Sequence, residues 1–360
     1  MKISQFVAGM SVGDAITNYV FSLDAMMKKW LGVESQIFYI EQHVPVALKG
    51  RGLPYSKYGE QASSENIVVL HFANGSELAP FIAQLPDKKV MIYHNITPGQ
   101  YFKSISDERV LIQEQGREQL KSLAAIFDLA LGVSDYNRKE LVDFGFKNTG
   151  VLPLILDDEL LNTKPSNKVL QANRDNLKNI ICVGRIAPNK RIEDILKVMY
   201  YIQRTSNVPH RLFLVGSFGG MERYRLFLLN LIQDLRLHRV VWCGHISQDD
   251  LVAYYKIAHV FFTMSAHEGF CMPLIEAMRF GVPVLARDTS AIGETIGGQG
   301  VLFQGLDYRR IAELLILMLE NEPWRQQIIQ NQKKRIERFS YSRIEQEWLS
   351  WIKKVSSIVS

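Results

Sequence analysis

The stretch HEGFCMPLIEAMRFGVPVLA, His267 to Ala286, carries two glutamates, Glu268 and Glu276, with seven residues between them. The apolar run VFFTM, Val260–Met264, precedes it. Pro273 stands where a helix typically begins, Gly281 stands where one ends, and a second apolar run, VPVLA, follows. The stretch therefore predicts a strand, a turn, a helix and a strand in succession. That succession is the repeating unit of a parallel sheet covered by helices.

The same alternation of apolar runs and helical periodicity continues on both sides of this stretch. In the first half we expect strands at Met1–Ala8, Ser35–Ile40, Ile67–Leu70, Lys89–His94, Leu129–Val133 and Thr149–Leu152, and helices at Ala15–Leu31, Glu77–Leu85 and Asp107–Leu123. In the second half we expect strands at Asn179–Gly184, Arg211–Gly216, Val240–Gly244, Val260–Met264, Val282–Ala286 and Val301–Phe303, and helices at Ile192–Arg204, Glu222–Leu235, Gln248–Ile257 and Leu274–Phe280.

The two halves are separated by a polar, proline-containing stretch, Leu154–Lys178, which reads as a linker. A chain of 360 residues also exceeds what one core usually absorbs. We therefore predict an α/β protein of two similar layered domains, residues 1–165 and 166–340. The final segment, 341–360, carries Trp348 and Trp351 at helical spacing and needs a surface to cover.

Composition excludes several classes of protein. With 47% hydrophobic and 22% charged residues the chain is typical of a globular protein, and no run approaches the ~20 apolar residues that span a bilayer. The start of the chain lacks the pattern of a signal peptide. Three widely separated cysteines favour the reducing cytoplasm, and the net charge of +5 is too diffuse to indicate nucleic acid.

Two turns in the first half are candidates for ligand contact, because ligands bind at the carboxyl ends of strands in open α/β sheets. Gly9 and Gly13 follow the first expected strand, without the G-x-G-x-x-G of a dinucleotide site. His94 ends another strand. A plain strand-to-helix connection explains the glycines equally well, and a histidine held by neighbouring backbone groups explains His94.

Cations flank a turn in the second half. Arg185 follows the strand that ends at Gly184, and Lys190 arrives as the next helix begins. Together they suit a diphosphate, since a guanidinium and an ammonium can neutralise two phosphoryl charges. Solvated surface charge is the alternative.

The two glutamates suit the binding of hydroxyl groups. A carboxylate only accepts hydrogen bonds, so Glu268 and Glu276 can hold vicinal hydroxyls on two rings of one ligand. Two alternatives stay open at this point. The pair can be the acid and base of a hydrolase, and Glu276 can simply stabilise the N-terminus of its helix.

The residues EGFCMPLIEAM, joined to VGRIAPNKR upstream, resemble the retaining nucleotide-sugar glycosyltransferases of family 4. YHNITPGQYF resembles the bacterial members that build O-antigen, capsule or other surface polysaccharides. The resemblance implies the GT-B fold, with two facing Rossmann-like domains and a C-terminal helix that crosses back to the first. It implies transfer of a hexose from a nucleotide-diphosphate sugar, bound by residues 166–340, to a glycan or lipid-linked acceptor at residues 1–165.

The resemblance also implies roles for single residues. Arg185 and Lys190 would bind the diphosphate, Glu276 the ribose and Glu268 the transferred sugar. Further donor contacts would come from His94, from the first loop at Gly13, and from the backbone N–H groups of Gly269, Phe270 and Cys271. No Asp-x-Asp pair is present to hold a cation, so we expect neither a metal nor a cofactor beyond the nucleotide-sugar co-substrate. Two features depart from the family: the first loop lacks paired glycines, and Arg191 replaces a small residue.

Other functions are consistent with the same scaffold. A nucleotide-sugar epimerase or a phosphorylase would use a similar donor site, and a non-catalytic partner would keep only the fold. Membrane contact is a separate expectation. In the first helix Val20, Leu23, Met27 and Trp30 share one side and end at two lysines. Either packing against the sheet or peripheral contact with the cytoplasmic face of the inner membrane explains that stripe.

Overall fold

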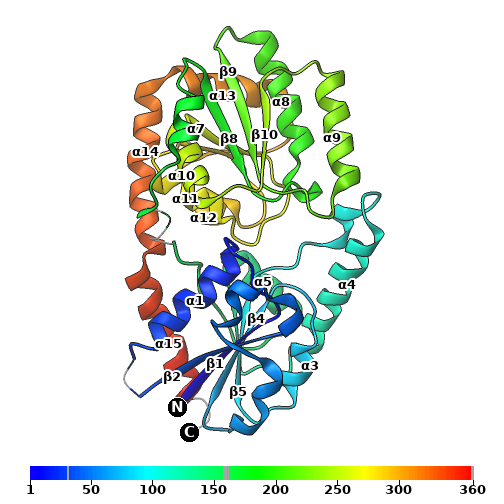
Figure 1. Ribbon diagram of the computed structural model, residues 1–360, viewed down its shortest axis with the longest axis vertical. Coiled ribbons are helices and arrows are strands. Elements are labelled where there is room, and N and C mark those ends of the chain that lie inside the picture. Colours follow the sequence, from blue (N-terminus) through cyan, green and yellow to red (C-terminus); the bar gives the residue numbers. More distant parts are fainter. Residues whose placement is uncertain (31, 157–159, 161, 358–360) are drawn as a thin grey trace. The chain divides into compact units, whose positions relative to one another are not determined.

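The computed structural model describes residues 1–30, 32–156, 160 and 162–357, and it divides the chain into two compact units. The first unit comprises Met1–Gln100, Glu108–Ile155 and Phe339–Ser360, and the second comprises Tyr101–Asp107 and Leu156–Arg338. The expected helix end at Leu31, residues 157–159 and 161 of the expected linker, and the last three residues of the C-terminal segment lie outside the described residues. Each unit contains one sheet with helices around it (Figure 1).

The first sheet is wholly parallel, in the order β3-β2-β1-β4-β5-β6-β7. Its strands are β1 (Lys2–Val7), β2 (Glu34–Tyr39), β3 (Leu53–Pro54), β4 (Ile67–Phe72), β5 (Lys88–Tyr93), β6 (Leu129–Gly132) and β7 (Thr149–Val151). The strand order reverses between β1 and β4, where Val7 pairs with His71. Ligands of open α/β sheets bind outside the carboxyl ends at such a reversal.

Helices of the first unit are α1 (Ala15–Met27), α2 (Val46–Lys49), α3 (Leu78–Ala83), α4 (Asp107–Ser122), α5 (Asp135–Asp143) and α15 (Tyr341–Ser357). Asp14 caps the N-terminus of helix α1, and its side chain accepts a hydrogen bond from the Thr17 N–H. Val20, Leu23 and Met27 of its apolar stripe are fully buried. Packing therefore accounts for these three residues.

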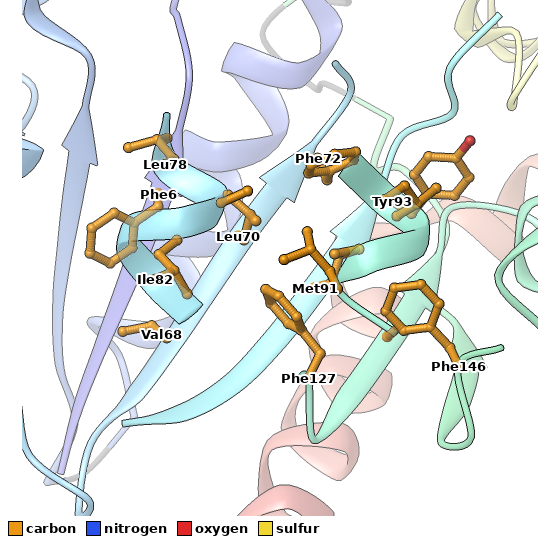
Figure 2. Close-up of a cluster of buried hydrophobic side chains, with 14 of the residues drawn as sticks. Phe6, Val68, Leu70, Phe72, Leu78, Ile82, Met91, Tyr93, Phe127 and Phe146 are labelled. Atoms are coloured by element: carbon orange, nitrogen blue, oxygen red, sulfur yellow. The ribbon is translucent and has the colours of Figure 1, made fainter. Parts of the chain in front are cut away.

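The main core of this unit joins α3 to the middle of the sheet (Figure 2). Leu78 and Ile82 of the helix lie against Phe6 of β1 and the β4 side chains (Figure 2). The Phe6 ring stacks on Phe38 at 5.2 Å between centroids. Because burial of these apolar side chains drives the packing, it fixes the central strands, and with them the loops at their carboxyl ends.

Helix α15, red in Figure 1, belongs to the first unit although it ends the chain. Trp348 is completely buried, and the indole N–H of Trp351 donates to the Val151 carbonyl at 3.2 Å. The Trp351 ring occupies the space that a Cβ at Gly150 would need. The tryptophans thus cover a surface of the first unit, as the sequence predicts.

The second sheet is also parallel, in the order β10-β9-β8-β11-β12-β13. Its strands are β8 (Lys178–Val183), β9 (His210–Val215), β10 (Val240–Gly244), β11 (Val260–Thr263), β12 (Val284–Arg287) and β13 (Val301–Phe303). Its helices are α7 (Asn167–Ala172), α8 (Ile192–Thr205), α9 (Glu222–Asp234), α10 (Gln248–Ile257), α11 (Met272–Arg279), α12 (Ile292–Ile296), α13 (Tyr308–Glu320) and α14 (Glu322–Ile336). The order reverses between β8 and β11.

The expected α/β fold with parallel sheets is confirmed. The stretch expected to be a linker without periodicity contains α7, so that part of the expectation is wrong. Strand β3 was not expected either, because two residues carry no recognisable alternation.

Candidate functional site

The carboxyl end of β8 is shaped by unusual backbone conformations. Gly184 has φ 144°, and Arg191, which precedes α8, has φ 52°. Between them the short 3₁₀ helix η5 (Pro188–Lys190) turns the chain. The Arg185 guanidinium donates to the Gly219 carbonyl at 3.0 Å, which places this cation at the strand end, as expected.

Lys190 and Glu268 meet at the point where the strand order of the second sheet reverses. The Lys190 Nζ lies 2.5 Å from Glu268 Oε1, and the side chains are only 19% and 9% exposed. Burial acts to lower the pKa of Lys190, but the attraction of Glu268 prevails and the pKa is raised. Lys190 therefore stays protonated, and the two residues form a preformed charge pair.

The turn that carries Glu268 is held by hydroxyl side chains that were not predicted from the sequence. The Glu268 N–H donates to Ser290 Oγ at 2.8 Å. Thr289 Oγ1 donates to the Ser265 carbonyl at 2.6 Å, and Thr295 Oγ1 donates to the Phe270 carbonyl at 2.7 Å. The sequence feature that could have indicated these hydroxyl side chains is the run DTSAIGET directly after β12. These bonds fix Gly269, Phe270 and Cys271 between the two glutamates.

Glu276 lies in α11, and its carboxylate is held by another residue that was not predicted. The hydroxyl of Tyr255, on α10, donates to Glu276 Oε2 at 2.7 Å. Tyr255 is buried and stacks on Phe280 at 5.3 Å between ring centroids. Burial, followed by the charge of Glu276, raises the pKa of Tyr255 well above its usual range. Tyr255 thus remains a hydrogen-bond donor that orients the carboxylate.

The remaining predicted residues belong to the first unit. Gly13 has φ 76° in the loop after β1, and a side chain there would meet open space. His94 follows β5, and its Nε2 lies 3.0 Å from His71 Nδ1. Burial lowers the pKa of His94 to about 3, so the ring is neutral at physiological pH.

The predicted residues of the second unit lie on the turn after β8, the turn after β11 and helix α11. Lys190 pairs directly with Glu268, and Arg185 lies on the same turn as Lys190. Glu276 lies within α11, one short helix segment after the Glu268 turn. Within the described ranges, no three His, Cys, Asp or Glu side chains converge as metal ligands. In the same part of the chain, every helix is too short or too polar to cross a bilayer.

Part of the chain is similar to a known protein family. Residues 164–335 match the family model "Glycosyl transferases group 1". This match confirms the expected resemblance to glycosyltransferases, over the part of the chain that holds Arg185, Lys190 and both glutamates.

Particular relatives agree with that class. The chain is 26% identical over 223 residues to the O-antigen chain mannosyltransferase B of Escherichia coli, and the match covers 59% of this chain and 58% of that protein. It is 23% identical over 248 residues to the Escherichia coli serotype-specific mannosyltransferase WbdA, covering 66% of this chain and 30% of that one. The chain therefore spans less than two thirds of either relative.

A solved structure supports the fold. The complex of Anabaena Alr3699/HepE with UDP-glucose matches with a TM-score of 0.75 at 17% identity, covering 98% of this chain and all of that one. At this identity the likeness shows the fold alone. The expected GT-B type of two-sheet α/β fold is thereby confirmed.

Proposed function

We propose that this protein is a retaining glycosyltransferase that moves a hexose from a nucleotide-diphosphate sugar to a glycan or lipid-linked acceptor in the synthesis of a bacterial surface polysaccharide. One observation carries the proposal: the region that matches the group 1 model holds a preformed Lys190–Glu268 pair where its strand order reverses. The O-antigen mannosyltransferase relative supports the reaction class and the polysaccharide product.

Arg185 and Lys190 are assigned to the diphosphate. A leaving diphosphate gains charge as the sugar departs, and fixed cations at a strand end stabilise that charge without reorganising. The raised pKa of Lys190 keeps its ammonium charged for this role. Loss of one such preorganised donor typically raises a barrier by ~2.7–4 kcal/mol.

Glu268 and Glu276 are assigned to hydroxyl groups of the donor. An ionised carboxylate offers about four lone-pair sites. Lys190 occupies one site of Glu268, and the Tyr255 hydroxyl occupies one of Glu276. We propose that Glu268 also accepts a hydrogen bond from a sugar hydroxyl, and that Glu276 also accepts from the ribose hydroxyls. We assign the N–H groups of Gly269, Phe270 and Cys271 to the same ligand.

Retention follows from attack on the face from which the diphosphate departs. The bond from the anomeric carbon to the phosphate oxygen breaks, and its electron pair stays on the diphosphate. The acceptor oxygen forms the new bond to that carbon, and its proton passes to a phosphate oxygen. No protein base is needed, which suits a site where Glu268 is already bound to Lys190. We further propose that the two cations make a divalent metal unnecessary. His94 is assigned to the sugar, and Gly13 to the approach of the first loop to the phosphates and the acceptor.

Turnover of defined donors tests the proposal. GDP-mannose or UDP-glucose is incubated with the full chain and octyl α-mannoside as acceptor probe, with and without EDTA. We expect nucleoside diphosphate release that rises with the mannoside, an α-linked product by proton NMR, and no effect of EDTA. Lys190→Met should lower the rate by about 100-fold or more, since ~2.7 kcal/mol or more of stabilisation is lost.

Glu313→Gln serves as the control, because Glu313 is 58% exposed and its ion pair is with the surface residue Arg309. A β-linked product would contradict retention, and loss of activity in EDTA would contradict metal independence. Epimerised donor without nucleotide release would favour an epimerase, and a requirement for orthophosphate would favour a phosphorylase. If neither donor is consumed under any condition, the non-catalytic alternative replaces the transferase.

A further inference from the structure

Three polar side chains form a chain of hydrogen bonds inside the first unit. Gln5 on β1 and His71 on β4 are 0% and 3% exposed, and His94 follows β5. His71 Nε2 lies 3.0 Å from Gln5 Oε1, and His71 Nδ1 lies 3.0 Å from His94 Nε2. The two imidazole rings lie within 21° of parallel, with centroids 5.3 Å apart. These contacts link the interior of the sheet to the residue at its carboxyl edge.

The direction of each hydrogen bond follows from Gln5. Its Nε2 donates to the Val20 carbonyl at 3.1 Å, so the atom that faces His71 is the oxygen, which only accepts. His71 must therefore carry its proton on Nε2. In a neutral imidazole the other nitrogen is then an acceptor. His71 Nδ1 consequently accepts from His94, which must carry its own proton on Nε2.

Both rings are neutral in this arrangement. Burial, followed by the proximity of His94, lowers the pKa of His71 well below its usual range, and burial lowers that of His94 to about 3. Geometry gives the same result, because a second proton on His71 would place an N–H against the N–H of His94. The Tyr19 ring packs edge-to-face with both imidazole rings, and its centroid lies 6.2 Å from that of His71 and 5.8 Å from that of His94.

The chain of hydrogen bonds ends on an unmet acceptor. His94 Nδ1 is buried and has no hydrogen-bond partner among the described residues. A buried acceptor without a partner is unfavourable, so the site gains from a ligand that supplies a donor. The proton on Nε2 is already given to His71, and His94 has no second proton to transfer.

We propose that Gln5 and His71 are positioning residues that hold His94 in the Nε2–H form, so that its Nδ1 accepts a hydrogen bond from a hydroxyl of the sugar ligand. The last clause rests on the proposed function, which supplies the sugar. His94 then acts by orienting the ligand and takes no part as an acid. The same lone pair disfavours a carboxylate at that position. The hydrogen-bonded series Gln5–His71–His94, which we call the relay, therefore favours a neutral hexose over a uronic acid.

The tautomer is measured without any substrate. Long-range proton–nitrogen correlation spectra of the full chain labelled with ¹⁵N-histidine distinguish protonated from unprotonated ring nitrogens. We expect Nε2 protonated and Nδ1 unprotonated in both His71 and His94. A wild-type spectrum with the proton of His94 on Nδ1, or with a charged His94 ring at neutral pH, would overturn the proposal.

Two matched variants test the relay itself. In His71→Asn the side-chain oxygen can replace Nδ1 as acceptor, whereas the similarly sized His71→Leu has no acceptor. We expect His94 to keep its Nε2–H form in the first variant and to populate both tautomers in the second. Gln5→Leu should mix the tautomers of both rings. An unchanged His94 spectrum in His71→Leu would contradict the relay.

Activity supplies the second readout. With GDP-mannose or UDP-glucose, His71→Leu should lower kcat/KM about tenfold, as expected for one lost hydrogen bond, and His71→Asn should recover most of it. Equal activity of all three proteins would contradict the role of the lone pair. A wild type that consumes neither donor but shows the expected spectrum would refute the proposed function and leave the tautomer relay supported.

Discussion

Lys190 and Glu268 form an ion pair, and both side chains are largely shielded from water. Removing ions from water is unfavourable, and a buried pair recovers that free energy only while both partners are present. A diphosphate that approaches Lys190 therefore competes with, or adds to, a contact that already exists. The pair is a part of the fold as well as of the proposed reaction.

A double-mutant cycle measures this dependence. Lys190→Met leaves Glu268 buried without its counter-ion and should lower the free energy of unfolding by ~3–5 kcal/mol. Lys190→Met combined with Glu268→Gln leaves no unpaired charge, so it should lose clearly less than the sum of the two single changes. Urea unfolding, followed for the second unit by hydrogen exchange, gives the values. Effects that add within ~0.5 kcal/mol would show that the residues are not coupled.

Single residues differ in how far the sequence reveals them. Arg185, Lys190 and the two glutamates were predicted as site residues because strand ends of a parallel sheet gather on one edge, and the sequence shows where strands end. Tyr255 and Ser290 were missed because their partners are chosen by packing between distant segments. Gln5 is a polar residue inside an apolar strand, which the sequence shows, but the sequence does not identify its hydrogen-bond partner.

Among the elements, the turn from β11 into α11 is held in a conformation that its sequence does not favour. Cys271 precedes α11 with φ 71° and ψ 69°, the left-handed region that glycine adopts without strain. Its side chain is buried, and burial raises the pKa of its thiol well above the usual range. The thiol is therefore neutral.

Two substitutions separate the strain from the packing. Cys271→Ala removes the sulfur but keeps a Cβ in the left-handed region, whereas Cys271→Gly removes both. The left-handed conformation costs a non-glycine residue ~1–2 kcal/mol. The free energy of unfolding of the glycine variant should therefore exceed that of the alanine variant by about 1 kcal/mol. Urea unfolding measures this as a higher midpoint concentration for the glycine variant. An alanine variant as stable as the glycine variant would show that the turn carries no such strain.

Elements were predictable where the hydrophobic period is long enough to read. The parallel strands of both sheets were expected because their apolar runs are bounded by turn residues. Helix α7, with six residues, and strand β3, with two, were too short to show a period. The stripe of α1 is consistent in the sequence with either packing or membrane contact, and only the packed fold shows that most of it is buried.

At the scale of the whole molecule, the last helix of the chain packs in the first unit. Helix α15 buries Trp348 and sets Trp351 over Gly150, so residues from both ends of the chain build the first unit. The second unit, built from one nearly continuous stretch, contains the side chains that we assign to the ribose and the diphosphate, namely Arg185, Lys190 and Glu276. The tryptophan spacing indicated that the last helix needs a surface, and the resemblance supplied which one.

Titration calorimetry tests whether this chain binds a nucleotide donor through Glu276 and its neighbours. GDP and UDP are titrated without added metal into the wild type, Glu276→Gln and the control Glu313→Gln. We predict that one nucleotide binds the wild type and the control alike, and that Glu276→Gln loses about 10- to 100-fold in affinity, as expected for one or more hydrogen bonds to a charged group. Equal binding to all three proteins, or no binding of either nucleotide to the wild type, would contradict the account.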